Sequence, residues 1–356
     1  MRQRHAAGKV GGSTTAAAAV GRGATVVVTG ANQGIGFEAC KQLADVSSVK
    51  KIVLTCRSKA KAETAIAKLV ELTGKDPSLF GYVVLDLDDY ASVTKAAAAL
   101  PDQVDRICLN AGNLVGGMAD SGVTKSFSPT LGHWHLMEKL FEAKKVAKGA
   151  RVIYISTELT RTIIPITYGG FTPIIWGFAE KDIDPAMHAD PNGATCNVWP
   201  LRAQMGSYGR AKIVGTLAFK QMAKEHPEVY FASTSPGAAP DTELAKKAYF
   251  PMSLAATYVP WAFICIGVGH TVAEGAGRYI AALTDADFPN QFPSGASAYS
   301  GKTLCCFWGA KGPLADNDQW VPYLRNPDLA VASAKALREE VKKWSMAAPG
   351  TRKMAR

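Results

Sequence analysis

A tyrosine and a lysine lie four positions apart in the stretch Tyr208-Gly209-Arg210-Ala211-Lys212. The residues from Tyr208 to Glu225 predict a long helix, and side chains four positions apart share one helix face. A phenol with a pKa near ~10 transfers protons poorly at neutral pH. Because a neighbouring ammonium stabilises the phenolate, we expect Lys212 to lower the pKa of Tyr208 and make it a general acid.

A glycine-rich turn is the second chemical signal. It reads Thr29-Gly30-Ala31-Asn32-Gln33-Gly34-Ile35-Gly36 and joins a β-branched stretch to an amphipathic segment. Glycines let a backbone turn tightly and approach a ligand, and the N-terminus of the following helix offers free N–H groups to a pyrophosphate. Its place between a predicted strand and a predicted helix indicates a dinucleotide site.

The choice of dinucleotide depends on the residues about twenty positions after the glycines. A site for NAD places an acidic residue there, to bind the ribose hydroxyls. This chain has Cys56-Arg57-Ser58-Lys59 instead. A guanidinium can hold a 2′-phosphate with paired, charge-assisted hydrogen bonds. Arg57 therefore favours NADP(H), although a basic residue at a helix start can also be merely solvated.

Strands and helices alternate along most of the chain. Short apolar stretches predict strands at residues 25–29, 51–56, 81–86, 104–110, 151–156, 229–235 and 302–308. Helical patterns lie between them, among them residues 131–146, 208–225 and 272–283. This alternation predicts an α/β fold with a doubly wound parallel sheet. At the carboxyl edge of such a sheet the glycine turn, Arg57, Asn110 and the pair Ser156-Thr157 would meet.

The chain divides into three predicted parts. Residues 1–23 form a basic leader, residues 24–310 a single dinucleotide-binding domain, and residues 311–356 an extension with an amphipathic helix over 329–346. Two stretches of the domain lose their periodicity. Residues 158–206 are a long insertion before the Tyr208 helix. Residues 237–271, uncharged from Ala248 to Gly269, predict a hydrophobic lid over a small lipophilic substrate, with a membrane-dipping segment as the alternative.

Composition excludes several classes. The chain has 356 residues, of which 47% are hydrophobic, and a net charge of +10 that suits an anionic cofactor or an acidic membrane surface. No nucleic-acid motif is present. Seven cysteines without a CxxC pair argue against a disulfide framework and a metal site. The leader has no acidic residue, which is typical of an organellar transit peptide; a plastid is favoured, and a disordered tail on a cytoplasmic protein is the alternative.

Four motifs in this order resemble the short-chain dehydrogenase/reductase family. They are the glycine turn from Thr29 to Gly36, Asn110-Ala111-Gly112, Tyr208-x-x-x-Lys212 and Pro236-Gly237. The resemblance covers about residues 24–310 and implies a Rossmann fold and an enzyme that transfers hydride from NADPH. It implies that Tyr208 protonates a substrate oxygen, Lys212 holds the nicotinamide ribose, Thr157 and Ser156 bind the substrate oxygen, and Asp86 contacts the adenine. The full set of cofactor contacts implied is Gly30, Asn32, Gln33, Gly34, Ile35, Gly36, Arg57, Asp86, Leu87, Asn110, Ala111, Gly112, Tyr208, Lys212, Pro236 and Gly237.

Two departures from the family pattern bear on activity. Thr157 stands where the family has its serine, with Ser156 one position before it. Pro129 stands where many relatives carry an asparagine, in Ser128-Pro129-Thr130-Leu131-Gly132-His133. A proline cannot supply the amide that helps hold Lys212 and its relay water. His133 and His135 could replace it, but helix histidines are more often packing residues.

Within the family, the long insertion and the stretch from Thr271 to Gly277 resemble the branch of protochlorophyllide reductases and retinol-dehydrogenase-like enzymes. Two residues argue against a protochlorophyllide reductase proper. That branch has a cysteine two residues after the lysine, where this chain has Val214, and it tends to have alanine where this chain has Gly112.

Three functions follow as expectations. The first is NADPH-dependent reduction of a carbonyl in a bulky apolar substrate, and the second is reduction of a C=C bond in a tetrapyrrole. The third is a low-turnover NADPH-binding scaffold in a larger assembly, which Pro129 and Thr157 favour and the intact Tyr208–Lys212 pair disfavours. The sequence leaves open whether the protein forms homo-oligomers and whether it contacts a membrane peripherally.

Overall fold

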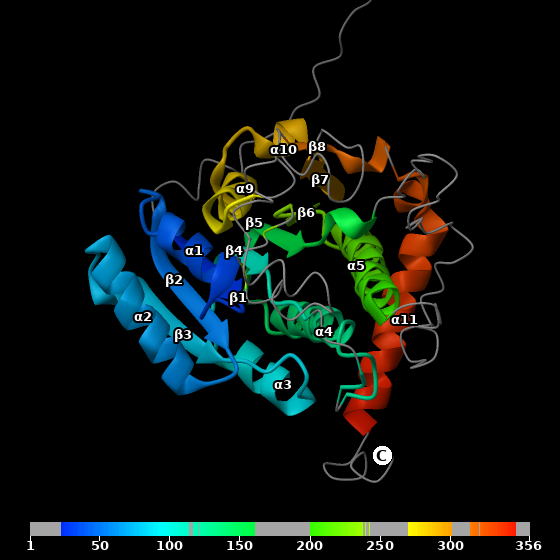
Figure 1. Cartoon of the computed structure of the whole chain (residues 1–356), viewed down its shortest axis with the longest axis horizontal. Coiled ribbons are helices and arrows are strands. Elements are labelled where there is room, and N and C mark those ends of the chain that lie inside the picture. Colours follow the sequence, from blue (N-terminus) through cyan, green and yellow to red (C-terminus); the bar gives the residue numbers. More distant parts are fainter. Residues whose placement is uncertain are drawn as a thin grey trace, which may run out of the picture.

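A sheet of eight strands forms the centre of the described part of the molecule (Figure 1). The computed structural model describes residues 23–113, 117–119, 121–160, 200–237, 239, 242, 270–300, 314–319 and 321–346. The strands are β1 (Ala24–Thr29), β2 (Val49–Cys56), β3 (Phe80–Val84), β4 (Val104–Leu109), β5 (Val146–Ile155), β6 (Tyr230–Thr234), β7 (Ala296–Ser300) and β8 (Leu314–Asp316).

The strand order is β3-β2-β1-β4-β5-β6-β7-β8. All neighbouring pairs are parallel except β7 and β8, which are antiparallel. The chain begins at β1, moves outward to β3 and then crosses back to β4 on the other side of β1. Ligands bind in doubly wound sheets at such a reversal. The predicted α/β fold with a doubly wound parallel sheet is confirmed.

Helices cover both faces of the sheet (Figure 1). Helices α1, α2 and α9 pack together on one face, while α3, α4 and α5 cover the other and α11 packs on α5 and α4. Their bounds are α1 (Gly34–Leu43), α2 (Lys59–Thr73), α3 (Tyr90–Ala99), α4 (Ser128–Glu142), α5 (Pro200–Glu225), α9 (Val272–Thr284), α10 (Phe288–Gln291) and α11 (Pro327–Met346). Short 3-10 helices are η2 (Pro77–Leu79), η3 (Glu158–Thr160), η6 (Asn317–Gln319) and η7 (Pro322–Arg325).

Local signals explain where several helices begin and end. Thr271 and Glu274 form a capping box that satisfies the first N–H groups of α9. The Asp89 carboxylate accepts a hydrogen bond from the Ala91 N–H and so caps α3. Gly74 ends α2 in the left-handed region, with a φ of 64° that a glycine adopts without strain.

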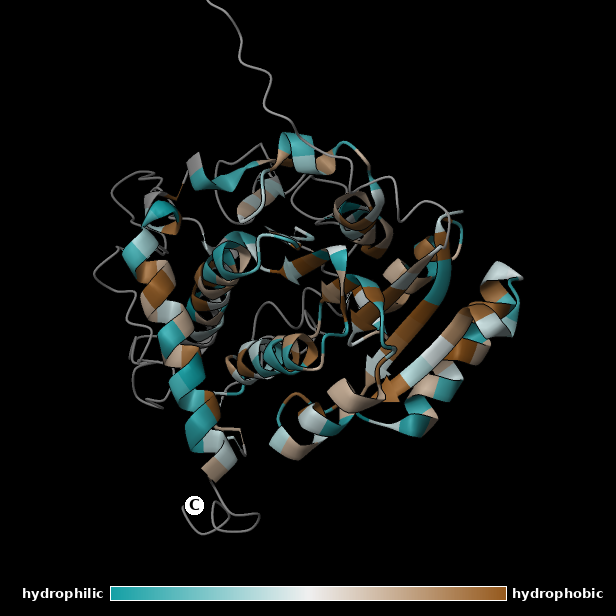
Figure 2. Cartoon of the chain, turned by 180° about the vertical axis from the view of Figure 1, so that it is seen from behind, coloured by the Kyte–Doolittle hydropathy of each residue, from teal (hydrophilic) through white to brown (hydrophobic). Residues whose placement is uncertain are grey.

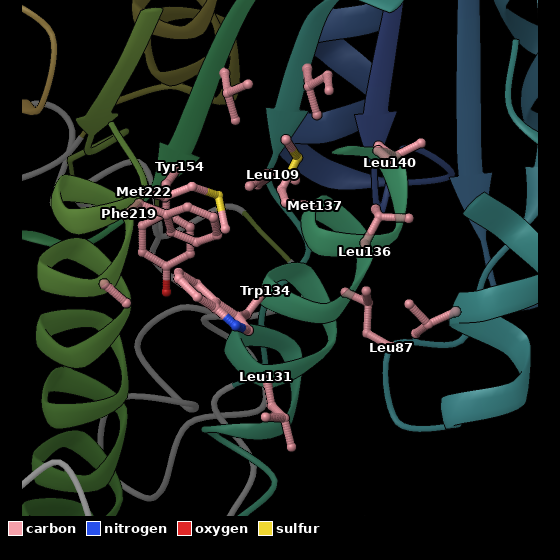
Figure 3. Packing of buried hydrophobic residues seen from close by; sticks show 14 of the residues in the cluster. Leu87, Leu109, Leu131, Trp134, Leu136, Met137, Leu140, Tyr154, Phe219 and Met222 are labelled. Carbon is pink, nitrogen blue, oxygen red and sulfur yellow. The ribbon is translucent and has the colours of Figure 1, made fainter. Parts of the chain in front are cut away.

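The core on the α4 and α5 side contains large aromatic side chains. Trp134, Tyr154, Phe219 and Met222 lie between these two helices and the end of β5 (Figure 3). The ring centroids of Tyr154 and Phe219 are 4.9 Å apart, and those of Trp134 and Phe219 are 5.8 Å apart. Interlocked rings of this kind resist displacement, since a buried aromatic side chain leaves a large cavity when removed. This packing therefore holds in place the helix α5, which carries Tyr208 and Lys212.

The predicted C-terminal amphipathic helix is confirmed as α11. Seen from behind, it alternates hydrophilic and hydrophobic residues along its length (Figure 2). Its buried residues include Leu337, Val341 and Trp344, and the Trp344 ring contacts Tyr90 with centroids 5.5 Å apart. The Arg338 guanidinium bonds to Glu138 of α4 at 3.1 Å and to Glu225 of α5. Helix α11 thus ties α4 to α5 from outside.

Three predicted boundaries differ from the structure. The helix predicted over residues 131–146 runs from Ser128 to Glu142. It stops there because Lys144 adopts a left-handed φ of 55° and the Lys145 N–H returns to the Leu140 carbonyl. The helix predicted from Tyr208 begins at Pro200, since proline fits a first helical turn, so the last part of the predicted insertion is helical.

Several predicted features lie outside the described residues. They are the leader, most of the insertion, nearly all of the lid and the strand predicted over 302–308. Within the described ranges, none of the helices combines the length and apolar character needed to cross a bilayer.

The packing of α11 predicts a graded stability series. Trp344→Ala should lower the free energy of unfolding by about 3–5 kcal/mol, because it empties a buried site. Arg338→Ala should cost about 1 kcal/mol, because 42% of that side chain is exposed and solvent screens its ion pairs. Lys335→Ala, on the outer face, is the matched control and should stay within about 0.5 kcal/mol. Urea unfolding measures all three; an unchanged Trp344→Ala variant would mean that α11 is detached in solution.

Candidate active site

The candidate site residues predicted from the sequence follow the carboxyl ends of adjacent parallel strands. The glycine turn follows β1, Arg57 follows β2, Asp86 follows β3, Asn110 follows β4 and Ser156 follows β5. Because these strands are parallel neighbours, the segments after them lie along one edge of the sheet. The edge includes the reversal between β1 and β4.

The glycine turn has the shape of a cradle. Gly30 and Gly34 adopt left-handed φ values of 65° and 58°. A Cβ atom on Gly36 would come within 2.6 Å of the Asn110 amide nitrogen and of the Gly30 carbonyl oxygen. A Cβ on Gly34 would meet nothing within 4 Å, so the backbone there borders open space. A close turn that opens onto the start of α1 fits the pyrophosphate of a dinucleotide.

Asn110 ties the end of β4 to the glycine turn. Its side-chain amide donates to the Thr29 carbonyl at 2.8 Å, and the Ala111 N–H donates to the Thr29 hydroxyl at 3.0 Å. A Cβ on Gly30 would lie only 3.0 Å from Ala111. The two segments are therefore locked together at the reversal of the sheet.

The two α4 histidines are packing residues. The Thr29 hydroxyl and the His133 Nε2 are 2.8 Å apart, and His133 is fully buried. Burial and the nearby Lys212 hold the pKa of His133 well below its usual value. His135 stacks on Tyr90 with ring centroids 4.3 Å apart, and burial lowers its pKa to about 4. Both imidazoles are neutral at pH 7.

Tyr208 and Lys212 share one face of α5 and are both buried. The Lys212 ammonium lies 5.7 Å from the centre of the Tyr208 ring and 4.9 Å from that of Tyr154. It donates a hydrogen bond of 2.7 Å to the Ile155 carbonyl oxygen at the end of β5. The ammonium is thus held between two aromatic rings and a strand end.

The expected lowering of the Tyr208 pKa is wrong for this structure. Removal from water raises the pKa of Tyr208, and the neighbouring Tyr299 raises it further. Burial also lowers the pKa of Lys212 to about 7. Desolvation disfavours the charged form of both groups. Tyr208 is a neutral phenol that can donate a proton, beside a lysine whose charge changes near neutral pH.

Gly112 lies where the segment after β4 meets Tyr208 and Lys212. A Cβ on Gly112 would lie 3.7 Å from the Lys212 ammonium and 3.9 Å from the Tyr208 hydroxyl. The end of β4 therefore reaches α5 at the two side chains that could move a proton. The glycine turn, Asn110 and the Tyr208–Lys212 pair belong to one continuous surface.

Ser156 and Thr157 have different surroundings. Ser156 is buried and its hydroxyl accepts a hydrogen bond of 3.0 Å from Thr216 of α5. Ser156 also bonds to the Tyr299 hydroxyl, whose pKa burial raises to about 12. Thr157 is half-buried, and its carbonyl accepts from the Thr160 N–H and hydroxyl at 3.2 Å and 3.0 Å. Thr157 is the more accessible of the two.

Pro129 lies in the first turn of α4 and leaves that helix regular. Next to it, the Thr130 hydroxyl is 2.8 Å from the Tyr154 hydroxyl and 3.4 Å from the Ala211 carbonyl of α5. A Cβ on Gly215 would collide with the Tyr154 hydroxyl at 2.3 Å, so the Tyr154 ring can pack against α5 only because residue 215 is a glycine. Near Lys212, Thr130 of α4 therefore contacts Ala211 of α5 directly and also the Tyr154 hydroxyl of β5.

The remaining predicted cofactor residues lie along the same edge. Arg57 is exposed beyond β2. Asp86 is half-buried and accepts a hydrogen bond of 3.1 Å from the Asp88 N–H, and Leu87 is buried. Gly237 has a left-handed φ of 76° after Pro236.

The sequence reasoning missed several residues. Thr216 lies four positions after Lys212, so helical spacing could have found it. Tyr299, Glu158 and Arg278 reach the area from other segments and carry no local motif.

Comparison with known proteins identifies the first part of the domain. Residues 24–161 match the profile of the family described as short chain dehydrogenase. The WW domain-containing oxidoreductase of Drosophila melanogaster is 26% identical over 67% of this chain and 54% of its own length. The (+)-neomenthol dehydrogenase of Arabidopsis thaliana is 36% identical over 40% of this chain and 44% of its own length. The chain spans about half of the length of these two relatives or less.

Solved structures extend the similarity of fold over most of the chain. Salutaridine reductase from Papaver somniferum has a TM-score of 0.53 at 20% identity, over 77% of this chain and 99% of its own. A short chain dehydrogenase of Escherichia coli CFT073, solved as a complex with NADPH, has a TM-score of 0.52 at 18% identity, over 77% of this chain and 95% of its own. The family profile over residues 24–161, the strand order and the glycine turn agree, so this part of the chain is similar to the short-chain dehydrogenase/reductase family and shares its Rossmann fold.

Proposed function

We propose that the protein is an NADPH-dependent reductase that adds hydride to the carbonyl of a bulky apolar substrate. The observation that carries this proposal is the meeting of Gly112 with the Tyr208 hydroxyl and the Lys212 ammonium. A proton donor, a cation and a cofactor-binding segment lie together there, as carbonyl reduction requires.

The described residues fit a phosphorylated dinucleotide. The open glycine turn and the start of α1 would hold its pyrophosphate, Asp86 and Leu87 its adenine, and Gly112, Tyr208 and Lys212 its nicotinamide half. When bound, NADPH supplies the hydride. Arg57 favours NADPH over NADH, because its exposed guanidinium follows β2, where the ribose lies in this fold.

The chain's own residues have separate tasks in reduction. The Tyr208 phenol, neutral because its pKa is raised, gives its proton to the substrate oxygen. The Lys212 ammonium then stabilises the phenolate left behind. The Thr157 hydroxyl binds the same substrate oxygen from the end of β5. Ser156, bonded to Thr216 and Tyr299, supports that segment from within.

Two arguments support an apolar carbonyl compound as substrate. The first is the uncharged stretch Ala248–Gly269, which the sequence predicts as a lid and which lies outside the described residues. The second is similarity over part of the chain to a protein named (+)-neomenthol dehydrogenase. A plastid location, membrane contact and oligomer formation stay predictions from the sequence.

A low-turnover NADPH-binding scaffold is the second candidate. The inward direction of Ser156 favours it, because that hydroxyl is engaged with Thr216 and cannot serve a substrate at the same time. A scaffold should bind NADPH as a reductase does, but it should show no NADPH oxidation that depends on Tyr208. A tetrapyrrole reductase differs from both in that a coloured ligand should raise its melting temperature.

Tyr208→Phe tests the reductase directly. The variant should lose about 10²–10⁴-fold in kcat, because a general acid contributes that much. Its Kd for NADPH, measured by protein fluorescence, should stay within about threefold, because the ring is retained. Turnover is followed as NADPH oxidation against quinones, retinoids, ketosteroids and tetrapyrroles. Tyr230→Phe, whose hydroxyl bonds to Phe292 at the opposite edge, is the control. Wild-type binding of NADPH without any turnover would favour the scaffold.

Arg57→Ala tests the choice of cofactor. Loss of charge-assisted bonds to a 2′-phosphate, worth about 1.5–3 kcal/mol, should weaken NADPH binding by about 10–100-fold. The affinity for NADH should change less than about threefold. Lys61→Ala, an exposed basic residue of the next helix, controls for general loss of positive charge. Equal weakening of both cofactors would make the assignment of Arg57 wrong.

The pKa of Lys212 predicts a pH profile. Burial lowers that pKa to about 7, so the ammonium is charged below pH 7 and neutral above it. The value of kcat/KM with NADPH varied should therefore be level below pH of about 7 and fall as the pH rises beyond it. Arg57→Ala, assayed with NADH, should keep the same inflection. A level profile up to pH of about 9 would show that the reaction does not depend on the lysine charge.

A further inference from the structure

Arg278 of α9 is a buried cation that has no part in the roles assigned above. It is 7% exposed. Its Nη1 donates to the Ser235 carbonyl oxygen at 3.1 Å and lies 3.5 Å from the Glu158 carboxylate. Its Nη2 donates to the His270 Nε2 at 2.9 Å. One guanidinium thus contacts three separate segments.

Two of these segments border the site. Glu158 is the first residue of η3, directly after Ser156-Thr157, and is itself buried. Ser235 directly precedes Pro236-Gly237. Helix α9 contacts both β5 and β6 and lies beside the sheet in Figure 1. A Cβ atom added to Gly275 of the same helix would lie only 3.3 Å from Pro236.

We propose that Arg278 is a positioning residue that sets the spacing between the substrate-oxygen segment and the cofactor segment. The inference rests on the proposed function, because that spacing matters to catalysis only if the two segments face the two reactants. Hydride transfer is sensitive to such spacing, since a displacement of about 1 Å can reduce a rate about 10²-fold.

Burial makes the contact rigid. Removing one partner of a buried ion pair leaves an uncompensated charge, so the Glu158 segment cannot leave Arg278 without a large cost. An arginine has donors only, so the His270 Nε2 must accept and the ring proton resides on Nδ1. That nitrogen is 3.8 Å from the Glu274 carboxylate, which belongs to the capping box at the start of α9. The guanidinium is thereby anchored to the helix that carries it.

The planar fork of arginine is needed for this arrangement. A lysine at position 278 could pair with Glu158 as a point charge. It could not also reach the Ser235 carbonyl and the His270 ring in fixed directions. Arg278→Lys should therefore keep the contact with Glu158 and lose the contact with the Ser235 carbonyl.

Activity and cofactor affinity should change differently in three variants. Glu158→Gln should lower kcat about tenfold and leave the Kd for NADPH within about threefold, because it releases only the substrate-oxygen segment. Arg278→Met should lower kcat about tenfold or more and weaken NADPH about fivefold or more, because it releases both segments. Arg278→Lys should recover most of kcat but keep the weaker NADPH binding. A merely structural role predicts parallel losses in all three, which would overturn the proposal.

Hydrogen exchange without cofactor or substrate gives a second readout. In Arg278→Met, the amides of residues 156–160 and those of Ser235 and Gly237 should both exchange about tenfold faster, and in Glu158→Gln only the first set. Arg151→Met is the matched control, because Arg151 contacts the other end of α9 through the Asp285 carbonyl at 2.6 Å. It should leave both sets unchanged.

The design separates failure of the inference from failure of the proposed function. If the wild type reduces none of the carbonyl compounds, the function is wrong, and the exchange pattern still shows whether Arg278 holds both segments. Unchanged exchange in Arg278→Met overturns the inference even in an active enzyme. If Arg278→Met does not fold, the double variant Glu158→Gln/Arg278→Met, which leaves no buried charge unpaired, replaces it in both measurements.

Discussion

Burial of the Lys212 ammonium is the constraint on which the site depends. A charge removed from water is stable only where other groups replace its hydration, and three do so here. The Ile155 carbonyl accepts its hydrogen bond, and the Tyr154 and Tyr208 rings lie 4.9 Å and 5.7 Å away. The end of β5, the pitch of α5 and the glycine at position 112 must all be right for these contacts to coexist. Compensation is incomplete, which is why the pKa of Lys212 falls to about 7.

The same constraint explains how α4 tolerates Pro129. A proline in the first helical turn costs little, because the N–H that it lacks has no partner within the helix. Thr130, its neighbour, places a hydroxyl 2.8 Å from that of Tyr154 and so connects α4 to the ring beside Lys212. Pro129, which stands where the family resemblance predicts an asparagine, therefore leaves α4 regular from Ser128 to Glu142.

Local patterns were sufficient to predict the fold and to bring the glycine turn, the strand ends and the Tyr208–Lys212 pair to one edge of the sheet. Each of these features depends on spacing within one segment, and strands alternating with helices leave few possible topologies. The direction of the Tyr208 pKa shift could not be predicted, because it depends on how completely distant segments exclude water from the phenol. Tyr299 and Arg278 were missed for the same reason, since each contacts the site area across more than eighty residues of chain.

The position of Thr157 shows why such long-range contacts matter. Ser156 is buried and bonded to Thr216 and Tyr299, whereas Thr157 is only half-buried, and Thr157 is the residue that our proposal places at the substrate oxygen. A β-branched side chain has few χ1 rotamers, and the direction of its hydroxyl therefore follows the backbone closely. That backbone continues directly into η3, which Glu158 fixes to α9 and the Thr160 carbonyl fixes to the Tyr323 hydroxyl. A serine side chain can rotate more freely than a threonine side chain. The direction of the Thr157 hydroxyl is therefore set by its backbone, which the contacts of η3 hold in place.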